Sequence, residues 1–251
     1  MEKIGTIVRF LDRYLEIESI KDSSWNGLQY EGKENIKKIL FAVDAGIEPF
    51  EKAAHLKANL IVVHHGLFWK SMSPCVVGVL QKRVRMLWSH GISLYAAHLP
   101  LDRHRVVGNN AQLLKLLRAK IRCEFCEIDG KCVGWIGGFN RALSLQEIRK
   151  KLDRGLNTQC TVLPFGKKKV KTIAVVSGGG GRALHEAVSA GVDLFLTGEI
   201  SDVYHVAKDV AINVIFAGHH ASETLGVKAL SELVRKKFKV ETVFIDIPTG
   251  L

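Results

Sequence analysis

Histidine and aspartate side chains follow three predicted strands at the point where each strand ends. The apolar run 60–63 precedes His64 and His65, the run 93–97 precedes His98 and Asp102, and the run 214–217 precedes His219. Open α/β sheets bind ligands at the carboxyl ends of their strands, because loops there carry functional groups while the sheet fixes their positions. Imidazole nitrogens and carboxylate oxygens suit Zn, Fe, Mn, Co or Ni. The pattern therefore predicts a divalent-metal site.

Glu223 adds a carboxylate to the third strand end. It lies four residues after His219, where a helix is predicted to begin near Ser222, and this spacing brings the two side chains toward one spot. Adjacent histidines at a strand end are expected to diverge. The spacing to Glu223 makes His219 the preferred ligand and leaves His220 as its neighbour. One tetrahedral catalytic ion takes three protein ligands, whereas five favour a pair of ions. The five predicted ligands are His64, His65, Asp102, His219 and Glu223.

Several of these residues also have a purely structural interpretation. His64 and His65 would then be buried or capping histidines, and Asp102 would be an N-cap. His98 is either a neighbour that orients a ligand or a hydrogen-bonded core histidine. Both interpretations stay open at the level of sequence.

Three further features near strand ends are candidates for substrate contact. Glu199 follows a strand and is assigned to the pocket rather than to the metal, and Arg103 would neutralise a substrate phosphate. The run 178–181 is four glycines between a strand and a helix predicted around 182–190. It is either a phosphate cradle or a tight turn, and the turn is preferred because no complete phosphate-binding motif is present.

The composition describes a folded chain with an excess of positive charge. The 251 residues carry 36 Lys and Arg against 25 Asp and Glu, a net charge of +11, which favours polyanionic partners such as nucleic acid or nucleotides. The lysines at 167–169 and 171 are the candidate contact surface for nucleic acid, although such runs are also typical of a solvated face. No signal peptide and no apolar run long enough for a membrane span is visible, so we expect a cytoplasmic protein without a membrane partner.

Five cysteines are present, of which Cys123, Cys126 and Cys132 lie close together in the sequence. A structural zinc site needs four ligands, and no second CxxC follows Cys126. We therefore expect neither a zinc knuckle nor a disulfide framework.

Short apolar runs alternate with amphipathic stretches, which predicts an α/β fold with mixed sheets flanked by helices. The predicted strands are 38–43, 60–63, 92–96, 131–137, 158–163, 170–176, 193–197, 213–217 and 241–245. Ser144 and Glu147 form a capping box that opens a helix to about Arg154, and a second helix is predicted over 222–237. The polar segment 124–131 interrupts this rhythm. We predict two α/β lobes, 1–125 and 126–251, the second beginning with a small α+β piece at about 131–165 before further βα units, and a dinuclear metal site in the cleft between the lobes.

The chain resembles the Ngg-interacting-factor-three family, whose members are often named GTP cyclohydrolase 1 type 2 homologues. The motifs that carry the resemblance, in order, are Asn26-Gly27-Leu28-Gln29, Val63-His64-His65-Gly66, His98-Leu99-Pro100-Leu101-Asp102 with Asn109-Asn110, Thr197-Gly198-Glu199, Gly218-His219-His220-Ala221-Ser222-Glu223, and Phe244-Ile245-Asp246-Ile247-Pro248. The resemblance implies two α/β lobes, a dinuclear site held by the same five ligands, and a toroidal homohexamer built as a trimer of dimers.

The expected function is a metal-dependent hydrolase acting on a nucleotide-like or other phosphorylated small molecule. Two ions of Zn, Mn, Fe, Co or Ni per chain would serve it, and the ligand types do not choose among these metals. The alternatives are a ring-shaped nucleic-acid-binding protein with structural metals and a metal-binding scaffold without catalysis.

Overall fold

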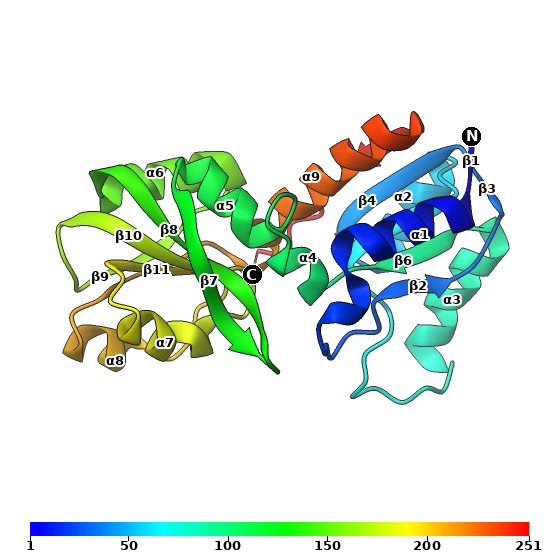
Figure 1. Ribbon diagram of the computed structural model, residues 1–251. Helices are drawn as coiled ribbons and strands as arrows, with labels where there is room; N and C mark the ends of the chain where they lie inside the picture. The colour runs from blue at the N-terminus through cyan, green and yellow to red at the C-terminus, as the bar shows by residue number, and fades with distance from the viewer. Residues whose placement is uncertain (251) are drawn as a thin grey trace. The chain divides into compact units, whose positions relative to one another are not determined.

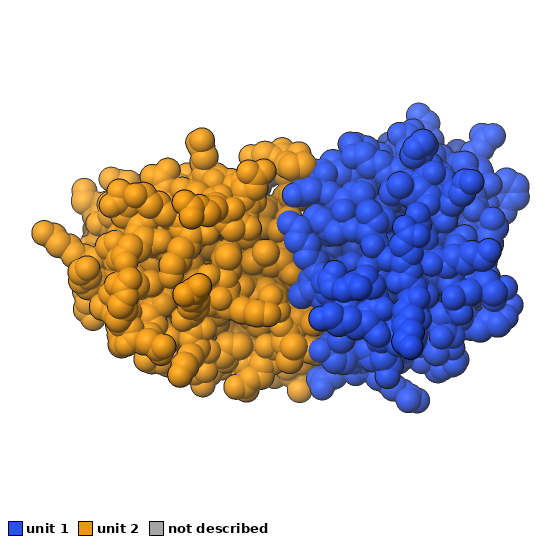
Figure 2. All heavy atoms as spheres, turned by 90° about the horizontal axis from the view of Figure 1, so that it is seen from above, with its two compact units in different colours: residues 1–101, 227–247 blue, residues 102–226, 248–251 orange. Residues whose placement is uncertain are grey.

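The computed structural model describes residues 1–250, whose chain forms two compact units (Figure 2). Unit 1 comprises Met1–Leu101 and Val227–Ile247, and unit 2 comprises Asp102–Gly226 with the residues from Pro248 onward. This division differs from the predicted one at residues 125 and 126. The reason is strand pairing: β13 (Glu241–Phe244) pairs in parallel with β4 (Lys38–Asp44), so the end of the chain returns to the N-terminal sheet.

Unit 1 is built on a five-stranded sheet with one antiparallel edge strand (Figure 1). Its order is β13, β4, β5 (Leu60–His65), β6 (Ser93–Ala96) and β2 (Gly27–Tyr30). The three central strands are almost entirely buried, as expected of parallel strands covered on both faces. The register pairs Asp44 with His65, which places polar side chains together at the carboxyl ends of β4 and β5.

The helices of unit 1 each bury an apolar stripe. In α1 (Ile4–Leu15) the buried residues recur every three or four positions, which is the period of one helix face. The other elements are the 3-10 turn η1 (Ile17–Ser19), α2 (Ile47–His55), α3 (Gly78–His90), and a short ladder of β1 (Glu2–Lys3) with β3 (Asn35–Ile36).

Unit 2 contains a six-stranded mixed sheet. Its order is β7 (Lys120–Ile128), β8 (Lys131–Ser144), β10 (Lys169–Val176), β11 (Leu194–Thr197), β12 (Asn213–Phe216) and β9 (Thr161–Pro164). Only β10, β11 and β12 run parallel, so their carboxyl ends lie at one edge of the sheet and carry the loops at 177, 198 and 218.

The helices of unit 2 complete its core. They are α5 (Asn109–Leu117), α6 (Leu145–Leu156), the 3-10 turn η2 (Gly181–Ala183), α7 (Leu184–Ser189) and α8 (Tyr204–Asp209), while α4 (Leu99–Arg103) and α9 (His219–Phe238) each contribute residues to both units. The capping box predicted at α6 is confirmed, because Ser144 and Glu147 exchange hydrogen bonds between side chain and backbone. Leucine and isoleucine side chains of α5 and α6 pack against β8 and β10 in one apolar cluster.

All nine predicted strands are present, although β8 continues much further than expected, to Ser144. The segment 124–131, which was expected to interrupt the alternation of strands and helices, instead lies in a hairpin of β7 and β8 that turns at Asp129 and Gly130 in positive φ. The strand escaped detection because β7 is an edge strand in which only Phe125 is buried, so its apolar pattern is weak. Among residues 1–250, no helix combines the length and the apolar character needed to cross a membrane.

Candidate functional site

Three histidines gather at the carboxyl end of the sheet in unit 1. His64 and His65 are the last residues of β5, and His98 follows β6. Each offers a ligand nitrogen, and these atoms all lie within 4.8 Å of one another. The ring centroids of His64 and His65 are 4.6 Å apart, so the expectation that adjacent histidines would diverge was wrong for this pair.

The rings of His64 and His65 are held through the nitrogen nearer the backbone. Nδ1 of His64 lies 2.9 Å from the carbonyl oxygen of Ala97, and Nδ1 of His65 lies 2.7 Å from a carboxylate oxygen of Asp44. Both partners are acceptors, so each ring donates from Nδ1 and Nε2 is the nitrogen that would bind an ion. An imidazole tethered in this way is the usual arrangement around a protein-bound metal.

His98 is held in the same manner by a buried carboxylate. Its Nδ1 lies 2.8 Å from Oδ1 of Asp22, a residue that is only 5% exposed. Burial alone would raise the pKa of Asp22, but hydrogen bonds from His98, from the Asn26 amide and from the Ser24 backbone hold it well below its ordinary value. The carboxylate therefore stays charged and fixes the His98 ring. Of the two interpretations open for His98, its place beside two other imidazoles favours the neighbour that orients a ligand over a simple core histidine.

Unit 2 brings together the other predicted ligands. The helix α9 begins at His219 rather than near Ser222, so His219 and Glu223 lie one turn apart on it. Nε2 of His219 is 3.3 Å from Oε1 of Glu223, as the i, i+4 spacing predicts. Glu223 is 2% exposed. A carboxylate this deeply buried requires a cation or several hydrogen bonds nearby.

The glycine run after β10 makes room for this pair. Gly178 has a φ of +60°, and a Cβ built on it would lie 2.2 Å from Oε1 of Glu223 and 3.2 Å from Nε2 of His219. A Cβ on Gly179 would lie 3.0 Å from Oε2 of Glu199. Only glycine therefore allows the backbone of this loop to approach the candidate ligands this closely.

Asp102 lies beside the same loop. Its Oδ1 accepts hydrogen bonds from Nδ2 of Asn109 and from the Ser177 hydroxyl, each at 2.9 Å. Oδ1 of Asn109 in turn accepts from the backbone N–H of Gly226 in α9 at 2.8 Å. This network ties Asp102 to the loop at 177 and to α9, the two elements that carry or surround His219 and Glu223.

The two residues predicted to contact substrate also lie in unit 2. Oε2 of Glu199 is 3.6 Å from Nδ1 of His219, and its side chain is mostly exposed, consistent with a position at the edge of the candidate ligands. Arg103 follows Asp102 in α4, and its Nε donates to the carbonyl oxygen of Cys132 at 3.3 Å. The anchoring of Arg103 to the β8 backbone was not visible in the sequence.

The residues that sequence reasoning missed are the partners Asp22, Asp44 and Ser177. Asp44 directly follows the predicted strand 38–43, as His64 and His65 follow the predicted strand 60–63, and this shared position was a usable signal. Asp22 lies in an irregular segment 76 residues before His98, and nothing in its local sequence marks it.

The nearby cysteines do not add a second ligand cluster. Cys123 and Cys126 lie on β7, and Cys132 lies on β8. Burial, with the charges of Glu186 and Cys132, raises the pKa of Cys126 to about 12. Within residues 1–250, no cysteine belongs to a group of three or more side chains that could hold a metal ion.

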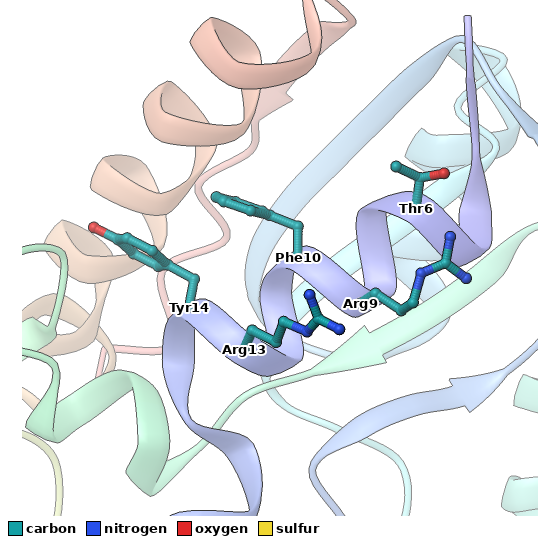
Figure 3. A pocket seen from close by; sticks show the side chains of 5 residues that line it. All are labelled: Thr6, Arg9, Phe10, Arg13 and Tyr14. Carbon is teal, nitrogen blue, oxygen red and sulfur yellow. The ribbon is translucent and has the colours of Figure 1, made fainter.

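A shallow pocket of about 400 Å³ lies on α1, and none of the candidate ligands lines it (Figure 3). It is lined by Thr6, Arg9, Phe10, Arg13 and Tyr14. Two guanidinium groups one helical turn apart and two aromatic rings make this surface suitable for an anionic ligand rather than for a metal ion.

The candidate ligands fit divalent metal ions by their donor chemistry. Unit 1 presents imidazoles oriented by oxygen acceptors, and unit 2 presents an imidazole with two buried carboxylates. Nitrogen and oxygen donors of this kind suit the later first-row metals.

The comparisons with known proteins agree over the whole chain. A family model described as Duf34/NIF3 (NGG1p interacting factor 3) matches residues 2–250. A protein of Archaeoglobus fulgidus named GTP cyclohydrolase 1 type 2 homolog is 47% identical over 249 residues, covering 99% of both chains. The solved structure of TTHA1606 from Thermus thermophilus is 39% identical with a TM-score of 0.88, and that of a protein named ybgI, described as of unknown function, is 34% identical with a TM-score of 0.94; each covers 100% of both chains.

Proposed function

The chain belongs to the Duf34/NIF3 family, and from this premise we propose that it is a divalent-metal-dependent hydrolase acting on a nucleotide-like or other phosphorylated small molecule. The observation that carries the proposal is the orientation of the imidazoles, with Nδ1 of both His64 and His65 held by an oxygen acceptor. The relatives are named GTP cyclohydrolase 1 type 2 homolog, and this name of theirs supports the proposal of a nucleotide-like substrate here.

Five residues would hold two divalent ions per chain. They are His64 and His65 of unit 1 and Asp102, His219 and Glu223 of unit 2. When bound, the ions would supply Lewis-acid activation of water. The protein's own contribution is orientation: Asp44 and the Ala97 carbonyl set the imidazoles, and Asn109 sets Asp102. Glu199 at the exposed edge of His219 would contact substrate, and Arg103 would balance phosphate charge.

Metal content and turnover test the proposal together. The purified protein, supplemented in turn with Zn, Mn, Fe, Co or Ni, is analysed for bound metal and screened against nucleotides and phosphoesters. We expect two ions per chain, and a Glu223→Ala variant that loses more metal than the matched variant His220→Ala, whose imidazole is the neighbour of a ligand. Equal losses would contradict the choice of His219 over His220, and metal content near zero with every metal would refute the proposal.

A second candidate function is nucleic-acid binding with structural metals. The net charge of +11 and the paired arginines on α1 favour it. The lysine cluster favours it less, because Lys167 pairs with Asp193 at 2.7 Å and Lys171 donates to the Asn140 carbonyl. Replacing the lysines at 167–169 and 171 with Gln should flatten the salt dependence of DNA affinity if these lysines contact phosphates. Affinity no tighter than about 10⁻⁴ to 10⁻⁶ M at physiological salt would reject specific nucleic-acid binding.

The proposed assembly is a homohexamer, a trimer of dimers, and it rests on the family. Light scattering tests it directly. A mass near the 27.8 kDa of one chain at micromolar concentration would reject it.

A further inference from the structure

An aromatic pocket lies in unit 1 beside the histidines. Its volume is about 480 Å³, within the range of small-molecule sites. Aromatic and aliphatic side chains line most of it, among them Trp25, Phe68, Trp69 and Met72, and Gln29 is one of its polar members. None of these residues has a role in the function proposed above.

Trp69 connects the pocket to the candidate metal ligands. Its ring centroid is 5.1 Å from that of His98, in an edge-on arrangement, and 6.0 Å from that of His65. Trp69 therefore borders the pocket and contacts two of the imidazoles at once, so the pocket and these histidines are neighbours in unit 1.

The pocket walls are held in place by backbone hydrogen bonds between two segments. The N–H of Trp25 donates to the carbonyl oxygen of Phe68 at 3.1 Å, and the N–H of Lys70 donates to that of Ser23 at 2.8 Å. Gln29 fastens both segments, since its side-chain amide donates to the Trp25 carbonyl and accepts from the N–H of Leu67. The backbone segments that carry the aromatic rings are thus fixed by hydrogen bonds before any ligand binds. This lowers the conformational entropy lost on binding.

Two large apolar side chains at the rim of the pocket are exposed to solvent, which favours a bound ligand that would cover them. Trp25 is 57% exposed and Met72 is 49% exposed, although both are large apolar side chains. The ammonium group of Lys70 lies 5.4 Å from the Trp25 ring centroid and adds a positive charge at the rim. Flat aromatic faces next to a cation match a flat ring that carries an anionic group.

Resting on the proposed function, we propose that this pocket binds a planar heteroaromatic ring of the substrate by stacking against Trp69 and Trp25. A nucleobase is the expected chemistry, because every base has a stacking face and its phosphate supplies the negative charge. The pocket would thereby select substrates by their ring, independently of the ligands that hold metal.

Equilibrium binding to the full-length, metal-loaded protein tests the inference. The probes are purine and pyrimidine nucleoside monophosphates, with ribose 5-phosphate as the ligand that lacks the ring. We expect nucleotides to bind roughly tenfold or more tightly than ribose 5-phosphate, the effect of one lost stacking contact. Trp69→Leu and Trp25→Leu should each lose this preference, and Trp69→Phe should restore part of it.

Trp88→Leu is the matched control, since Trp88 is 72% exposed on α3 and does not line the pocket. Metal content is measured for each variant, so that a loss of binding is separated from a loss of metal. Should Trp69→Leu unfold, Trp25→Leu, which alters an exposed side chain, decides alone. Equal binding of nucleotide and ribose 5-phosphate would overturn the inference, as would an unchanged preference for nucleotide in both variants. A change in the mass measured by light scattering for Trp25→Leu would also overturn it, because it would show that a second chain covers the pocket. Ring-dependent binding, with no turnover of any nucleotide or phosphoester in the activity screen described above, would uphold the inference and refute the hydrolase.

Discussion

Replacing Gly178 with alanine tests whether the glycine loop sets the position of Glu223. Two costs are expected. An L-residue at a φ of +60° costs about 1–2 kcal/mol relative to glycine. The added Cβ would also lie 2.2 Å from Oε1 of Glu223, and because that carboxylate is buried it cannot move into solvent, so overpacking adds about 1–3 kcal/mol. The expected loss of unfolding free energy is about 2–5 kcal/mol.

Gly130 provides a matched control for the backbone cost. It has a φ of +82° at the turn between β7 and β8, and a Cβ there would meet no atom within 4 Å. Gly130→Ala should therefore lose only the backbone share, about 1–2 kcal/mol. The two variants are compared by urea unfolding of the metal-free protein, which removes any contribution of bound metal.

Metal affinity gives the second measurement for this pair of variants. If Glu223 is a ligand, displacing its carboxylate should weaken metal binding by about 10- to 100-fold in Gly178→Ala, the effect typical of disturbing a ligand's support. Gly130→Ala should bind metal as the parent protein does. Competition with a chelating dye measures both. Equal stability and equal affinity in the two variants would refute the close approach of the loop to Glu223 and the role given to that residue.

Three further predictions concern buried polar groups. Asp22→Asn should cost about 2–3 kcal/mol at pH 7 in the metal-free protein, because it weakens the hydrogen bonds that the buried carboxylate accepts from His98, Asn26 and Ser24. The pKa of Asp22 is lowered, so this stabilisation is present above the ordinary pKa of 3.8 and fades as the pH falls further. Urea unfolding should show the two proteins converging in acid, and a difference in stability that does not depend on pH would contradict this. Asn109→Ala should lower the free energy of unfolding by about 2–4 kcal/mol and should lower the metal content, since it removes hydrogen bonds to Asp102 and Gly226. Urea unfolding and elemental analysis measure the two effects, and a variant with unchanged stability and metal content would contradict the role of this network. Burial raises the pKa of the Cys126 thiol to about 12, so this thiol should react with a disulfide reagent at pH 8 far more slowly than the exposed Cys75. Mass spectrometry measures the labelling rates, and equal rates for the two cysteines would contradict the burial of Cys126.

The local part of the structure could be predicted from the sequence. Apolar runs such as 60–63 specify buried strands because a buried strand must be apolar on both faces, and the capping box at Ser144 specifies a helix start through hydrogen bonds between neighbours in the chain. The spacing of His219 and Glu223 predicted their contact for the same reason, since helix geometry alone brings them together. Each of these inferences depends on interactions within a few residues.

Only the tertiary structure decided which distant groups meet. Asp22 holds His98 from 76 residues away, and Asn109 bonds to Gly226 across 117 residues. The return of 227–247 to unit 1 depends on the pairing of β13 with β4, and the edge strand β7 depends on its hairpin with β8. These contacts are selected by the packing free energy of the whole chain, in which many pairings compete, and no periodicity within a short stretch of sequence records which of them is most stable.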